Sequence, residues 1–95
     1  MLIGINTTRY IGSPDLLTST ANQEVIPPPP SNWTSGYRFY DFDFNNLQDC
    51  HVKINGSLPI FIHAGNGISV GVSGAPISSL IIVESGIQFT WIASY

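Results

Sequence analysis

The chain has 95 residues and carries only three Lys or Arg and six Asp or Glu, for a formal net charge of −3. A chain of this length forms one small domain, and so few basic residues leave no positive surface for a nucleic acid or an anionic membrane, so neither partner is expected. The single cysteine, Cys50, excludes an intramolecular disulfide, and no apolar run approaches the roughly 20 residues that span a bilayer.

The small number of charged residues bears on how the surface is used. Soluble domains carry about a quarter charged residues, whereas this chain has 9%. One explanation is a surface covered by other subunits, since the centres of protein interfaces are depleted in charge. The alternative is an uncharged polar surface, because Ser, Thr and Asn are abundant in this sequence.

Residues 1–35 are predicted to form an extended N-terminal arm. Their apolar residues follow neither a helical nor a strand period, and Pro14 and Pro27–Pro30 interrupt any regular element. Such a segment cannot bury enough surface on itself to offset the entropy lost on ordering, so neighbouring chains are expected to hold it. The expected assembly contacts of the arm are Ile3, Ile5, Tyr10, Ile11, Leu16, Leu17, Val25, Ile26, Pro27, Pro28, Pro29, Pro30 and Trp33.

The proline run at the end of the arm, Pro27–Pro30, is predicted to form a polyproline II rod of about 12 Å. The rod would act as a spacer that holds the arm away from its own domain, and it would reduce the entropy lost when the arm docks. Under this hypothesis, deletion of residues 1–35 leaves a domain that still folds but no longer assembles.

Residues 36–95 show an alternation of apolar and polar residues, interrupted by short turns, which predicts a β-domain. Between residues 37 and 46, for example, Tyr40, Phe42 and Phe44 share one face, whereas Asp41 and Asp43 share the other. Strands are expected over residues 37–46, 50–54, 58–63, 68–72, 77–84 and 87–93.

The expected fold class is all-β: a small antiparallel β-sandwich or open barrel of about six strands with an extended N-terminal arm. The edge strands of such a domain need protection, which partner chains would supply. At Asn55-Gly56, a three-residue loop with Gly56 in the left-handed conformation is expected to pair Val52 with Leu58 and Cys50 with Ile60.

The candidate catalytic and metal-binding residues each have a simpler structural explanation. Asp41 and Asp43 resemble a cation site, but alternate strand positions are where solvated carboxylates normally lie. Cys50 and His51, with His63 one strand away, suggest a metal site, but adjacent strand residues point to opposite faces. The glycine-rich residues 65–74 lack the Lys and the helix of a phosphate loop. The sequence therefore predicts no catalytic residue, no metal, no cofactor and no enzymatic activity.

Four short segments between residues 47 and 95 carry a resemblance to a known class of protein. They are KING at Lys53–Gly56, HAGNG at His63–Gly67, API at Ala75–Ile77 and VESGIQFTWI at Val83–Ile92. In these segments the chain resembles small virion structural proteins of tailed bacteriophages and prophages. The resemblance implies a β-rich building block that acts as a homo-oligomer on the particle, and it implies no catalytic residue.

The expected function is that of a structural component of a tailed phage particle, located in the virion and assembled in the cytoplasm of the host bacterium. The β-domain would dock on a repeated lattice or ring, as capsid decoration or cement or as a neck or tail adaptor, and the arm would lace neighbouring subunits. The expected partners are other virion proteins and further copies of the chain.

The sequence leaves open two alternatives to a structural role. Trp33, Tyr37, Tyr40 and Trp91 could form a platform on which sugar rings stack, as in a host-surface carbohydrate-binding module of a phage tail. The proline run also satisfies the PxxP spacing of SH3 ligands, which suggests a peptide-binding adaptor.

Overall fold

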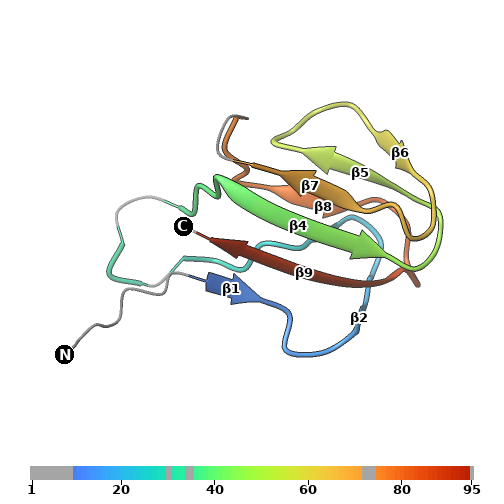
Figure 1. Ribbon diagram of the computed structural model, residues 1–95, viewed down its shortest axis with the longest axis horizontal. Helices are drawn as coiled ribbons and strands as arrows, with labels where there is room; N and C mark the ends of the chain where they lie inside the picture. The colour runs from blue at the N-terminus through green and yellow to red at the C-terminus, as the bar shows by residue number, and fades with distance from the viewer. Residues whose placement is uncertain (1–9, 30, 34–35, 72–74, 95) are drawn as a thin grey trace.

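Two antiparallel β-sheets pack face to face in the computed structural model, which describes residues 10–29, 31–33, 36–71 and 75–94 (Figure 1). The described residues form nine strands and no helix, so the prediction of an all-β antiparallel fold is confirmed. The strands are β1 (Tyr10–Gly12), β2 (Leu17–Thr18), β3 (Gln23–Glu24), β4 (Asp41–Asn46), β5 (Cys50–Ile54), β6 (Ile60–Ile62), β7 (Ile68–Val70), β8 (Leu80–Ile82) and β9 (Gln88–Ser94).

The two sheets divide the strands unequally. The five-stranded sheet has the order β1-β9-β4-β7, and β2 pairs with the beginning of β9. The four-stranded sheet has the order β3-β8-β5-β6. In Figure 1 the five-stranded sheet faces the viewer, and β6 and β7 lie on the side of the molecule away from β1.

The core lies between the sheets and is built by the six strands expected from the sequence, which correspond to β4–β9. Because side chains alternate between the two faces of a strand, Phe42 and Phe44 of β4 point inward together, where they lie in one buried cluster with Phe89 of β9. The other buried apolar residues of these strands and of their connections are Cys50, Val52, Ile77, Leu80, Ile82, Ile87, Trp91 and Ala93.

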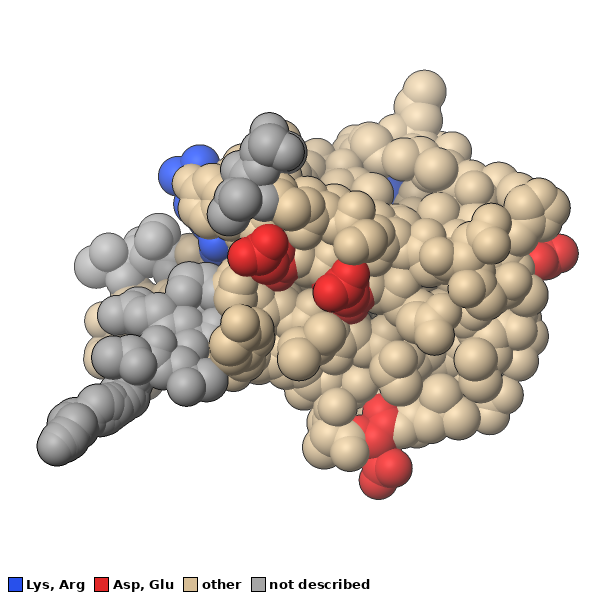
Figure 2. Space-filling view, viewed as in Figure 1, with Lys and Arg blue, Asp and Glu red and all other residues tan. Residues whose placement is uncertain are grey.

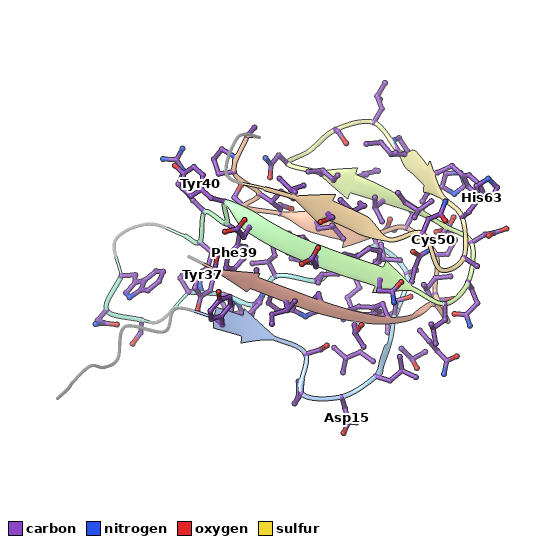
Figure 3. All side chains as sticks on the ribbon, in the orientation of Figure 1. Asp15, Tyr37, Phe39, Tyr40, Cys50 and His63 are labelled. Atoms are coloured by element: carbon purple, nitrogen blue, oxygen red, sulfur yellow. The ribbon has the colours of Figure 1, made fainter. Side chains whose placement is uncertain are left out.

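The alternation of buried and exposed residues shifts by one position before β4. Phe39 is buried and exchanges two backbone hydrogen bonds of 2.8 Å with Ile77. Tyr40 and Asp41 are then exposed in succession, and the pattern resumes at Phe42. The expectation that Tyr40 shares the inner face of Phe42 is therefore wrong, and Tyr40 points away from the sandwich (Figure 3).

The segment expected to be an arm is part of the sandwich from Tyr10 onward. β1 and β2 pair with β9, and β3 pairs with β8, so this segment runs antiparallel beside the C-terminal strands. It passes from one sheet to the other at Ser19, whose N–H donates to the carbonyl of Ile87 and whose carbonyl accepts from the N–H of Gly86, both at 2.8 Å. The structure therefore shows no domain boundary at residue 36, because described strands on both sides of it pair in the same sheets.

The end of this segment also belongs to the sandwich. Val25 and Ile26 are 7% and 6% exposed, and both are members of the core. Pro27 is half-buried, whereas Pro28 and Pro29 are exposed on the connection that leads from β3 in one sheet to β4 in the other. The prolines therefore link two parts of one domain and do not hold an arm away from it.

The hairpin between β5 and β6 differs from the expected register by two residues. Val52 pairs with Ile60, and not with Leu58. Asn55 and Gly56 have φ values of 52° and 77°, as in a two-residue type I′ turn, and the N–H of Ser57 donates to the carbonyl of Ile54 at 3.0 Å. One extra residue after the turn keeps the inward faces of the two strands matched, and it leaves Leu58 exposed.

Candidate functional site

The structure offers two surfaces on which a partner could bind. The first, called the open side, is formed by the outer edges of β6 and β7, the end strands of their sheets. Its exposed apolar side chains are Leu58, Ile60 and Phe61, with exposed fractions of 85%, 43% and 47%. Four half-buried apolar residues, Ile54, Ile62, Ile68 and Val70, lie beneath them against the core. Within the described residues, no strand pairs with the outer edge of β6.

The turn that joins β6 to β7 is fixed to the core by Asn46, the last residue of β4. The Asn46 side chain is fully buried, and its Nδ2 donates to the carbonyls of Gln48 at 2.8 Å and His63 at 3.1 Å. Its Oδ1 accepts from the N–H of Gly67 at 3.0 Å. Because buried polar groups are stable only when they are hydrogen-bonded, this residue holds the turn in place.

Gly67 completes the attachment of the turn. Its φ of +62° lies in the left-handed region, and a Cβ at this position would lie 2.1 Å from the carbonyl oxygen of Phe44. A glycine is therefore required here, both for its backbone conformation and for the close approach of the two segments.

Polar and aromatic side chains gather at the end of the open side. Nδ1 of His51 lies 2.5 Å from Oε2 of Glu84, and the backbone N–H of His51 donates to Oε1 at 2.8 Å. The ring of Phe61 lies between those of His51 and His63, with centroid distances of 5.3 and 4.8 Å. Nδ1 of His63 lies 4.0 Å from Oδ1 of Asp49.

Two ionisable groups at this end have shifted pKa values. Burial acts to raise the pKa of Glu84, but the hydrogen bonds from the backbone and ring of His51 outweigh it, and the net effect is a pKa below the ordinary value. Burial, together with the negative charges of Glu84 and Asp49, raises the pKa of Cys50 to about 11. The Cys50 thiol is therefore neutral and unreactive at physiological pH.

The structure separates the residues considered for a metal site. Cys50 points into the core, whereas His51 lies on the opposite face of β5 beside Glu84. In the described part of the chain, no three His, Cys, Asp or Glu residues are placed to hold a metal ion together. Asp41 and Asp43 are exposed on the outer face of β4, as expected for solvated carboxylates.

The second surface, called the outer groove, crosses the outer face of the five-stranded sheet. It has a volume of about 530 Å³ and extends from the connection between β1 and β2 to the turn before β7. Its exposed polar side chains are those of Asp15, Asp43, Asn45, Asn66, Ser69 and Thr90. Two smaller hollows of about 220 and 120 Å³ adjoin it, and both are lined by Tyr10 and Ile92.

The four aromatic residues considered for a sugar-stacking platform do not form one. Tyr37 and Trp91 are buried, at 7% and 6% exposure, so neither presents a free ring face. Trp33 packs edge-on against Tyr37 with a centroid distance of 5.0 Å, and Tyr40 projects separately from the end of the sandwich. The prediction of a platform built from these residues is therefore wrong.

The side chains expected to contact neighbouring subunits are divided by the structure into buried, exposed and undescribed groups. Val25 and Ile26 are in the core of their own chain, and Ile11 and Leu17 pack against it, which removes them from the candidate contacts. Tyr10, Leu16, Pro28, Pro29 and Trp33 are exposed. Ile3, Ile5 and Pro30 lie outside the described residues.

Sequence reasoning did not find either of the two surfaces. The sequence predicted that edge strands would need protection, which applies to the open side. It did not show which strands form the edges. The outer groove is assembled from segments far apart in the sequence, around residues 13–16, 43–45, 66–69 and 90–92.

Comparisons of the chain with protein-family models, with curated proteins and with solved structures found no match. Within the described ranges, the structure contains no helix long and apolar enough to span a membrane.

Proposed function

We propose that this chain is a non-enzymatic structural subunit of a tailed phage particle, and that it assembles through the open side. The observation that carries the proposal is the exposure of Leu58, Ile60 and Phe61 beside the unpaired edge of β6. The resemblance of residues 47–95 to small virion structural proteins supports the choice of particle.

Exposed apolar surface and unpaired backbone groups both favour assembly through the open side. An edge strand presents unpaired N–H and C=O groups to any strand of another chain, and proteins that remain monomeric usually block such edges with charges or prolines. Here Ile60 and Phe61 occupy the two faces of the edge strand, and β6 itself contains no charged residue. Contact with another chain would satisfy the backbone groups and remove the apolar side chains from water.

The low charge of the whole chain supports the same conclusion. Interface centres are depleted in charged residues, and only 9% of this chain is charged. The partners are further copies of the chain or other virion proteins, arranged on a repeated lattice or ring of the head, neck or tail.

The first test is the mass of the purified full chain in solution, measured by light scattering over a range of concentrations. The wild-type chain should form a defined oligomer, and Ile60→Glu should weaken the association constant at least tenfold, because a charge is placed in an apolar contact. Leu16→Glu is the matched control, since Leu16 is similarly exposed, at 47%, but lies on the connection between β1 and β2, at the other side of the five-stranded sheet from β7. A wild-type chain that stays monomeric would contradict self-assembly.

The second test is mass spectrometry of phage particles purified from a lysate in which the gene is expressed. The chain should be present at a fixed copy number per particle, and the Ile60→Glu variant should be depleted from the particles. A chain that is absent from every particle, and monomeric in solution, would overturn the proposal.

A further inference from the structure

The outer groove gathers in one place several hydrogen-bonding groups that the protein itself leaves unused. Among the described residues, the side chains of Asp43, Asn45, Ser69 and Thr90 are exposed and form no hydrogen bond or ion pair with the rest of the chain. Two asparagines outside the groove show the contrast. The side chain of Asn46 makes four hydrogen bonds and that of Asn55 makes four.

The register of the sheet sets these free groups side by side. Asp43 of β4 is paired with Ser69 of β7 on one side and with Ile92 of β9 on the other. Asn45 is paired with Thr90, two positions further along the same strands. Paired side chains on one face of a sheet lie about 5 Å apart, so these polar groups are close enough to contact one ligand together.

The apolar residues of this face complete the surface. Tyr10 is 65% exposed and lines the two smaller hollows, and Ile92, which is 52% exposed, lines all three. A tyrosine ring and an aliphatic side chain can contact the C–H face of a sugar, while polar neighbours bind its hydroxyl groups. Leu16 closes the end of the groove on the connection between β1 and β2.

The charge of the face limits the class of ligand. Figure 2 shows Asp and Glu atoms over β4, while Lys and Arg atoms are visible mainly at the left end of the view. No described residue that lines the three hollows is Lys or Arg, and Asp41 and Asp43 are both present. Phosphorylated and acidic polymers would be repelled, whereas an uncharged polyhydroxylated chain would not.

We infer that this face binds a neutral oligosaccharide, with one ring stacked on Tyr10 and the hydroxyl groups of the next rings hydrogen-bonded by Asp43, Asn45 and Thr90. The inference goes beyond the proposed assembly role, because the binding residues lie on the outer face of the five-stranded sheet and not on the edge of β6. The binding residues named here lie on β1, β4 and β9, whereas the open side is formed by the edges of β6 and β7.

The test is a binding measurement on the full-length chain with neutral and acidic hexasaccharides. The neutral compounds are hexamers of glucose, galactose, rhamnose and N-acetylglucosamine, and the acidic compound is hexagalacturonate. At least one neutral hexamer should bind in calorimetry, and it should shift the amide resonances of β1, β4 and β9 in an NMR titration. Failure of all four neutral hexamers to bind, or stronger binding of hexagalacturonate, would overturn the inference.

Variants locate the binding within the face. Tyr10→Ala and Asn45→Ala should each weaken binding about tenfold, since each removes one exposed contact. Tyr40→Ala and Asn32→Ala are the matched controls, because they remove an exposed tyrosine and an exposed asparagine that line none of the three hollows. Equal losses in the control variants would contradict the site, as would full binding by Tyr10→Ala and Asn45→Ala.

The outcomes of this test and of the assembly test are separable. The Ile60→Glu variant should no longer show the mass of the oligomer, but each outer groove should keep its affinity for the oligosaccharide. Tyr10→Ala should do the reverse, with wild-type mass and reduced affinity for the oligosaccharide.

Discussion

At the scale of single residues, two neighbouring asparagines of β4 have opposite roles. Asn46 points inward and binds three carbonyl groups and the N–H of Gly67, whereas Asn45 points outward into the groove. Because the two residues are of the same type and adjacent in sequence, the difference between their roles is due to burial. The sequence shows only that two asparagines end an alternating strand, and the partners of Asn46 are contributed by a turn about 20 residues away.

We expect Asn46→Ala to lower the free energy of unfolding by about 2 to 4 kcal/mol, because it leaves buried backbone groups without hydrogen-bond partners. Asn45→Ala should change this free energy by less than about 0.5 kcal/mol, since its side chain is exposed. Urea denaturation of the two variants and the wild type measures both values. A stability loss shared equally by the two variants would contradict the assigned role of Asn46.

Glu84 makes the stability depend on pH in a defined direction. The folded-state pKa of Glu84 lies below the ordinary value of 4.5. The contribution of Glu84 to the free energy of unfolding is therefore complete above pH 4.5, and it is lost as the pH falls through the folded-state pKa. Because the side chains of His51 and Glu84 are 44% and 37% exposed, the contribution should be no more than about 1 kcal/mol.

The prediction for this pair concerns the variant Glu84→Gln, which keeps an acceptor for the N–H of His51 but removes the charge. Urea denaturation at about pH 7 should show wild type more stable than the variant by up to about 1 kcal/mol. As the pH is lowered below 4.5 the difference should shrink, because wild-type Glu84 becomes protonated as the pH falls through its folded-state pKa. A difference that stays constant over this pH range would show that the charge of Glu84 makes no contribution.

At the scale of elements, alternation in the sequence was sufficient to find β4–β9 but not β1–β3. The first group contains strands of up to seven residues with a regular inward face, whereas β2 and β3 have two residues each. A strand of two residues cannot display a period, so its existence depends on the neighbour it pairs with. The prediction that the proline run is a spacer was wrong for the same reason, because the short strands before it show no alternation of apolar and polar residues.

Removal of the N-terminal strands should therefore unfold the domain, in contrast to the expectation from the sequence that residues 36–95 fold alone. Deletion of residues 1–26 removes β1–β3 together with Val25 and Ile26, whose burial contributes about 1.5 to 3 kcal/mol each. This sum approaches the whole stability of a small domain, about 5 kcal/mol at the lower end.

Circular dichroism during thermal unfolding tests this prediction, with deletion of residues 1–9 as the comparison. The shorter deletion removes no described strand pair, so a cooperative transition near that of wild type is expected. The longer deletion should show no cooperative transition. A fragment of residues 27–95 that unfolds as cooperatively as wild type would restore the idea of a separate N-terminal arm.

At the scale of the whole molecule, the proposed assembly depends on apolar contact and not on ion pairs. The open side presents Leu58, Ile60 and Phe61, and the two histidines that pack on Phe61, His51 and His63, each lie beside a carboxylate of their own chain, Glu84 and Asp49. The association constant should therefore change by less than about threefold between low and moderate sodium chloride, because no charge pair is screened. Sodium sulfate should strengthen association, since it favours burial of apolar surface.

Sedimentation velocity in the two salts measures this dependence. A tenfold weakening in sodium chloride would show that charged groups form the contact, and would move the interface away from the open side. The sequence predicted a charge-poor surface suited to assembly, but it could not locate the contact. The proposed location rests on the sheet order, which makes β6 and β7 end strands, and on their common side of the sandwich (Figure 1).

The central position of β9 determines when the fold can form during protein synthesis. β9 follows all the other described strands along the chain, yet β1, β2 and β4 all pair with it. The five-stranded sheet therefore cannot be completed until β9 has been synthesised, and β1 and β2 must wait unpaired until then. Because pairings between distant residues also form slowly, each new chain passes through a period in which its apolar strands are exposed to chaperones and to other nascent copies.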